Sequence, residues 1–277
     1  MKTTALRNAL AAAALAATVA PSPAAAQWAP AGEWKYVASI YMYLPQLNAD
    51  FNIPLQDGGT AAASTKVSPR DLLRNLKFTF MGAFDAHNGR WGVFTDLIYL
   101  NEGGRESSTR NLEFNGRPLP IGVTKTATLD LETTIWTLAG QYRVVADQAW
   151  TVDLLAGARM LNIKPKLGWS LQGDLGDYPI PGRQGSAELS ETSWDGIVGA
   201  KGRYTFGDRR EWFVPFYVDV GTGQIDLTWQ IAGGIGYSFS WGEIVALWRY
   251  LDFENGSGSK LDSLSTNGPM LGVNFRW

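Results

Sequence analysis

Acidic and basic side chains recur at strand-like spacing along this chain. Asp153 and Arg159 lie six positions apart, and Asp195, Lys201 and Arg203 share one parity in the next segment. Residues an even number apart on a strand point to the same face. Twelve charged residues fit this pattern: Asp85, Asp96, Asp153, Asp195, Asp219, Glu243, Arg143, Arg159, Lys201, Arg203, Arg249 and Arg276. Six acids and six bases on one confined face predict an ion-pair network, because buried charges must be paired or hydrated.

Two functional interpretations of this network stay open. Ion pairs between neighbouring strands would close the interior of a narrow barrel, and this is the interpretation we favour. The same charges could instead line a small hydrophilic pore. A wide porin needs roughly 16 strands, which a chain of 277 residues with long loops does not supply.

Other kinds of chemistry have little support in the residue types. The chain has no cysteine, which excludes disulfides, thiolate metal sites and a cysteine nucleophile. Its one histidine, His87, lies in a tight turn, where a polar turn residue is expected rather than a general base. We therefore expect no catalytic residue, metal or cofactor. The alternative is a membrane-embedded hydrolase or acyltransferase acting on lipid or peptide through carboxylates alone.

The first 26 residues have the features of an export signal. Lys2 and Arg7 precede an alanine-rich apolar run, and three alanines end at Ala26. This pattern is typical of a secretory signal with an A-x-A cleavage site. We expect residues 1–26 to be a signal peptide and 27–277 to form one domain. Lys plus Arg (24) nearly balance Asp plus Glu (26), so nucleic-acid binding is not expected.

Alternation with period two dominates the rest of the chain and predicts an all-β protein. The alternating segments number ten: 34–45, 76–87, 91–101, 128–144, 150–163, 193–206, 212–222, 226–239, 242–253 and 268–277. Each is long enough to cross a bilayer as a tilted strand. Tight links alternate with long polar ones at 46–75, 102–127, 164–192 and 254–267. This is the pattern of an up-and-down antiparallel transmembrane β-barrel of about ten strands, with eight or twelve as alternatives.

Period two does not by itself say which face is inside. A soluble barrel would turn its apolar face inward. Here that face is rich in alanine and glycine in several segments, which would leave voids in a ten-stranded interior, whereas lipid tails can fill such gaps. We therefore expect the apolar face to meet lipid.

Aromatic residues mark the segment ends at the side of the tight links. They are Trp34, Trp91, Trp150, Trp212, Trp241, Tyr142, Tyr204, Tyr237 and Trp277. Amphipathic rings prefer the headgroup boundary, so these residues predict an interfacial girdle. Within the first long link, 68–76 has a serine cap, Pro69 and spaced leucines, which predict a short helix. Its expected role is to cap a strand end.

Several motifs resemble those of a bacterial family. The ending Leu271–Trp277, with alternating apolar residues and a final aromatic, resembles the terminal strand signal of outer-membrane barrels. The segments 39–45, 71–73, 89–99 and 248–252 look like those of small opacity-like or OmpA-like β-barrel proteins. The resemblance implies a Gram-negative outer-membrane location, periplasmic termini and recognition of the last strand by the barrel assembly machinery. It also implies contact with outer-membrane lipids and lipopolysaccharide, a monomer, and a porin-like, structural or surface-interaction role.

Overall fold

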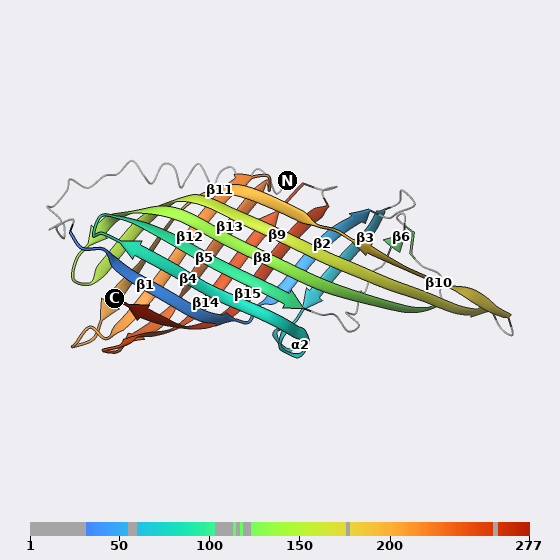
Figure 1. Ribbon diagram of the computed structural model, residues 1–277, viewed down its shortest axis with the longest axis horizontal. Coiled ribbons are helices and arrows are strands. Elements are labelled where there is room, and N and C mark those ends of the chain that lie inside the picture. The colour runs from blue at the N-terminus through green and yellow to red at the C-terminus, as the bar shows by residue number, and fades with distance from the viewer. Residues whose placement is uncertain are drawn as a thin grey trace.

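The computed structural model describes residues 32–54, 60–102, 113–114, 117–118, 123–175, 178–256 and 260–277. The expected signal peptide lies outside these residues. Ten strands form a closed antiparallel ring (Figure 1). They are β1 (Lys35–Tyr43), β4 (Leu76–His87), β5 (Trp91–Glu102), β8 (Val123–Ala146), β9 (Trp150–Leu175), β11 (Glu191–Phe206), β12 (Trp212–Gly223), β13 (Leu227–Ser238), β14 (Gly242–Glu254) and β15 (Leu261–Arg276). The predicted ten-stranded barrel is confirmed.

Ring closure joins the two ends of the described chain. β15 pairs with β14 on one side and with β1 on the other, with Arg276 opposite Val37. The tight turns at 88–90, 147–149, 207–211 and 239–241 lie at this same end of the barrel. We call it the tight-turn end and its opposite the long-loop end.

The alternation in sequence becomes an inner and an outer face. On β11, Asp195 and Ile197 are buried, whereas Trp194 and Val198 are exposed. On β15, Leu271 is 61% exposed, while Gly268 and Gly272, which lie on the opposite face of the strand, are buried. The outer surface is thus a belt of exposed apolar side chains, of the kind that transmembrane barrels present to lipid.

One seam of the barrel departs from simple up-and-down pairing. β1 continues after Leu44 and Pro45 as β2 (Gln46–Pro54), and the two strands pair with successive parts of β15. Proline has no backbone N–H to donate, which explains the interruption. On their other side, β1 pairs with β4 but β2 pairs with β3 (Thr60–Val67). The sheet therefore splits where β3 and β4 diverge.

A short helix, α2 (Pro69–Asn75), fills this split between β3 and β4. Leu72 is buried in the interior, whereas Leu73 points outward and is exposed. The helix predicted at 68–76 is present, but it acts as a wedge between diverging strands rather than only as a cap. Among the described residues, no helix is long and apolar enough to span a membrane.

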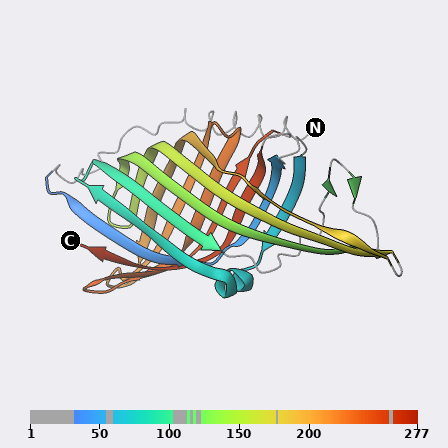
Figure 2. The same cartoon turned by 45° about the vertical axis from the view of Figure 1, so that its right-hand side comes forward.

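The longest strands leave the barrel as an arm. β9 has 26 residues, and only 150–163 pair with β11 in the barrel wall. Beyond them, β9 pairs with β8 on one side and with β10 (Tyr178–Glu188) on the other. At about 3.3 Å per residue, the part from Lys164 to Leu175 extends roughly 40 Å past the rim. We call this three-stranded extension the arm; it projects at the end opposite the C-terminus (Figures 1 and 2).

The four long polar links also contain regular structure that the sequence analysis did not predict. The link 46–75 contains β2, β3 and α2, and the link 164–192 contains the end of β9 and all of β10. β8 already begins at Val123 and β15 at Leu261, and the two-residue strands β6 (Glu113–Phe114) and β7 (Arg117–Pro118) lie within the link 102–127. These segments are polar and short of regular alternation because most of them do not face lipid, so the membrane-strand pattern does not mark them.

Candidate functional site in the barrel interior

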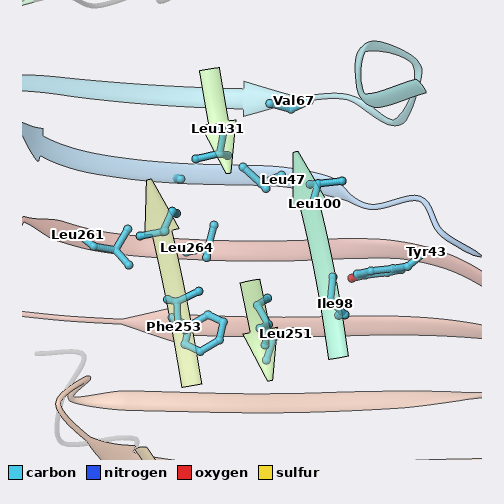
Figure 3. Close-up of a cluster of buried hydrophobic side chains, with 14 of the residues drawn as sticks. Tyr43, Leu47, Val67, Ile98, Leu100, Leu131, Leu251, Phe253, Leu261 and Leu264 are labelled. Atoms are coloured by element: carbon cyan, nitrogen blue, oxygen red, sulfur yellow. The ribbon is translucent and has the colours of Figure 1, made fainter. Parts of the chain in front are cut away.

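An apolar layer crosses the interior at the long-loop end. Its buried members come from both walls of the barrel and from α2: Tyr43, Leu47, Ala49, Phe51, Val67, Leu72, Met81, Ile98, Leu100, Leu131, Ile135, Leu161, Ile163, Ile225, Leu251, Phe253, Leu261 and Leu264. Figure 3 shows the strands that carry Ile98, Leu100 and Leu131 crossing steeply over those that carry Leu47, Leu251 and Leu264. The two walls thus pack face to face like sheets in an orthogonal β-sandwich.

This layer closes the interior. Side chains lining a water-filled channel would be exposed on their inner side, yet Ile163, Leu251 and Leu264 have no exposed surface. Ile225, in the turn between β12 and β13, is equally buried and covers the layer. Its backbone N–H donates to the Asp195 carboxylate at 2.9 Å, which fixes this turn over the interior.

Beneath the apolar layer lie two buried ion pairs. Arg159 on β9 forms a bidentate pair with Asp219 on β12, with Nη1 2.9 Å from Oδ1. Arg249 on β14 pairs with Asp96 on β5 at 2.7 Å, and the Tyr41 hydroxyl donates to the same carboxylate. The Gln230 side-chain oxygen accepts from both arginines. Each pair spans the interior, because its partners come from non-adjacent strands.

A second set of ion pairs lies nearer the tight-turn end. Arg143 donates to Asp153 at 2.8 Å, and Lys201 pairs with Asp85. Arg203 pairs with Glu243 at 2.7 Å. Arg276 pairs with that same carboxylate, so two guanidinium groups share Glu243.

The structure thus brings eleven of the twelve charged residues singled out from the sequence into ion pairs. Asp195 is the exception: among the described residues it forms no ion pair and accepts from the Ile225 backbone instead. In the same part of the chain, no group of three His, Asp or Glu side chains is arranged to hold a metal ion.

His87 lies at the start of the tight turn, as expected, but its side chain is buried. It is the last residue of β4 and is buried in the interior rather than exposed in a polar turn. Its Nδ1 accepts from the Gly89 N–H at 2.9 Å, and its Nε2 lies 3.7 Å from the Asp153 carboxylate. β4 ends at His87, as the predicted segment 76–87 does, and the ring of this residue points into the interior. Asp153 is bound to Arg143, so His87 lies beside an ion pair.

A cavity of about 330 Å³ occupies the interior at the tight-turn end. Arg249, Asp96 and Tyr41 form its floor, and Arg203 and Arg276 lie among its other lining residues. Arg249 is almost fully buried, whereas the side chains of Arg203 and Arg276 are 33% and 39% exposed. This gradient places the mouth at the tight-turn end, where the interior opens as a blind vestibule.

The aromatic residues expected to form a girdle lie around the outside of that same end. Trp34, Trp91, Trp150, Trp212, Trp241 and Trp277 are all exposed. Trp91 packs against Tyr142, Trp150 against Tyr204 and Trp212 against Tyr237, with ring centroids 4.7–4.8 Å apart. Each of these pairs joins directly opposed residues of adjacent strands.

The apolar layer is the feature that sequence reasoning missed. Its signal is a local loss of alternation, as in Leu97-Ile98-Tyr99-Leu100, where both faces of the strand are apolar. Strands buried on both faces read as continuous apolar runs. Such a run at the long-loop end of β5 could have indicated that the inner face there is apolar and excludes water.

Comparisons with known proteins relate the chain to others by fold. No family model matches the sequence, and no curated protein matches it. Similar solved structures include the outer membrane protease OmpT from Escherichia coli, with 8% identity and a TM-score of 0.48 over 90% of this chain and 98% of that one. Ail of Yersinia pestis, solved with the heparin analogue sucrose octasulfate, has 14% identity and a TM-score of 0.32 over 88% and 98%. The translocator domain of the autotransporter NalP from Neisseria meningitidis has 15% identity and a TM-score of 0.26 over 100% and 98%. Likenesses this distant say nothing of activity.

Proposed function

We propose that this chain is a monomeric bacterial outer-membrane β-barrel protein with a structural or surface-interaction role, and that it is neither an open channel nor an enzyme. Its termini and tight turns face the periplasm, and the arm stands outside the cell. The apolar layer across the interior is the observation that carries the proposal. A dry layer gives ions no hydrated path, because an unpaired charge in an apolar environment costs several kcal/mol or more.

The outer surface supports the membrane location. Large apolar side chains such as Ile40, Val198 and Leu271 are exposed around the ring. A contiguous apolar belt of this extent would make a water-soluble protein associate. Lipid covers it in the proposed setting, with lipopolysaccharide in the outer leaflet, and the aromatic residues at the tight-turn end meet the inner headgroups.

The arm supports the surface role. A hydrocarbon core is only about 30 Å thick, so β9 is far longer than a tilted spanning strand requires. Ion pairs between Lys164 and Glu132 and between Lys166 and Glu188 tie the three strands of the arm together. An ordered extension beyond the membrane offers a partner a preformed surface.

Location and conductance test the proposal together. Fractionation should recover the mature protein in outer membranes, with a folded band that shifts on heating in gel electrophoresis. Planar bilayers containing the purified barrel should show no steady conductance above that of bare lipid. Recovery in the soluble periplasm would refute the membrane location, and steady single-channel steps would refute the closed interior. Hydrolysis of an added lipid or peptide that is lost on Asp→Asn substitution would favour the enzyme instead.

A further inference from the structure

We propose that the blind vestibule at the tight-turn end binds a small organic anion that has one negative charge and an apolar body, such as an aromatic carboxylate. The proposal goes beyond the surface role, because it concerns the opposite end of the barrel and holds whether or not the arm has a partner.

The size and lining of the vestibule fit a small-molecule site. Its volume of about 330 Å³ lies at the lower end of the range for ligand pockets, roughly 300–1,000 Å³. One wall is apolar, with Phe213, Val245 and Met270 among its residues. Pockets of this kind bind the apolar body of a ligand and use a few polar groups to orient it.

The charges near the mouth leave one positive charge in excess. Arg143, Lys201, Arg203 and Arg276 line the vestibule with three partner carboxylates, those of Asp85, Asp153 and Glu243. Four cations against three anions leave a net charge of +1. The excess is at Glu243, where two guanidinium groups share one carboxylate. A ligand carboxylate would give the second guanidinium a partner of its own, and guanidinium binds carboxylate in a bidentate geometry.

Aromatic rings place these cations beside apolar surface. The Arg203 guanidinium lies 5.1 Å from the centre of the Phe213 ring, and the Lys201 ammonium lies 4.2 Å from that of Phe94. An anion bound to either cation would therefore have its apolar part against a ring. At the floor, Arg249 is buried with its Nε without a hydrogen-bond partner among the described residues. This donor is a second polar group that the vestibule leaves unsatisfied.

The experiment measures binding by ¹⁹F NMR to the purified barrel in lipid nanodiscs, with empty nanodiscs as the blank. The probe is 4-(trifluoromethyl)benzoate, and its controls are the neutral 4-(trifluoromethyl)benzamide and the cationic 4-(trifluoromethyl)benzylamine. We expect saturable binding of the carboxylate, at least tenfold tighter than either control. Equal binding of the three probes, or no saturable binding of the carboxylate, would overturn the proposal.

Two substitutions with opposite expected signs locate the site. Arg276→Gln removes the excess charge and should weaken carboxylate binding by about tenfold, the loss of one charge-assisted hydrogen bond. Glu243→Gln frees both guanidinium groups and should tighten it. Lys166→Gln, on the arm, should leave it unchanged. If Arg276→Gln does not assemble, Arg203→Gln makes the same test from another strand. Unchanged affinity in the arginine variant and in Glu243→Gln would refute the site.

Discussion

The charged residues of the interior differ in how much the fold depends on them. Arg159 and Asp219 are both fully buried, whereas Lys166 and Glu188 on the arm are each 56% exposed. The positions of charged residues in the sequence do not show which of these pairs is buried. Removing one partner of a buried pair leaves an uncompensated charge, whereas an exposed pair is already solvated.

The first prediction follows from this difference. Arg159→Ala should lower the free energy of unfolding by about 3–5 kcal/mol, because Asp219 is left buried and unpaired. Lys166→Ala should change it by only about 0–1 kcal/mol. Urea unfolding in lipid vesicles, followed by tryptophan fluorescence, measures both. Equal small effects would mean that water reaches Arg159 and that the interior is not closed.

Arg203 lies between these extremes. Its side chain is a third exposed, and Arg276 stays on Glu243 when Arg203 is removed. The full penalty for an orphaned charge therefore does not apply to Arg203→Ala. This sharing of one carboxylate could not be read from a balanced count of six acids and six bases, because it depends on which strands meet across the barrel.

Two glycines on β13 differ in what surrounds them. At Gly236 a Cβ atom would overlap the Phe213 ring, which packs directly over it. At Gly233 a Cβ atom would lie 3.7 Å from the Pro215 carbonyl oxygen, an ordinary contact. Close packing therefore requires glycine at position 236 but not at position 233.

The second prediction compares these positions. Gly236→Ala should destabilise the barrel by about 1–3 kcal/mol, as overpacking does in a filled interior. Gly233→Ala on the same strand should be close to neutral. The measurement is the unfolding midpoint of each purified variant. A neutral Gly236→Ala would show that the Phe213 ring moves freely, which would also weaken the description of the vestibule wall.

At the scale of elements, the ten barrel strands were predictable and the additions to them were not. β12 and β13 alternate cleanly because one face meets lipid and the other the interior. β2 and β3 lie beyond the split and contribute to the apolar layer, β2 with Leu47 and Phe51 and β3 with Val67. The end of β9 pairs with β8 and with all of β10 to form the arm, which extends beyond the barrel wall. Neither β2 and β3 nor the strands of the arm alternate between lipid and interior, so the period-two pattern of the sequence does not predict them.

β15 carries the third prediction. Trp277 ends the chain at the tight-turn end, where its backbone exchanges hydrogen bonds with Tyr36 and closes the ring. Its ring stacks with Tyr36 at a centroid distance of 6.0 Å. Trp277→Asp should place a charge at the headgroup boundary and remove the final aromatic. We expect markedly less assembled barrel and more degraded precursor, measured by heat-modifiable migration. Normal assembly would show that the last residue carries no assembly signal.

At the scale of the whole molecule, all three strands of the arm continue into the barrel, β8 and β9 directly and β10 through Leu189 and Ser190 into β11. The barrel wall needs β9 only as far as Ile163, which pairs with Glu191 on β11. Just above, the Leu189 N–H donates to the Pro165 carbonyl at 3.1 Å. These two residues already lie opposite each other, as the ends of a hairpin do.

The last prediction uses this geometry. Replacing residues 166–188 with Asn-Gly, a sequence that favours a two-residue hairpin turn, should remove two of the three strands of the arm, those of β9 and β10, while keeping the wall between β9 and β11 intact. The variant should assemble in the outer membrane and keep its free energy of unfolding to within about 1 kcal/mol, because the removed strands pair outside the ring. Heat-modifiable migration and urea unfolding measure this, and surface binding should be lost while carboxylate binding in the vestibule is kept. Failure to assemble would mean that the arm helps to form the barrel, and the separation of a structural ring from an interacting surface would be wrong.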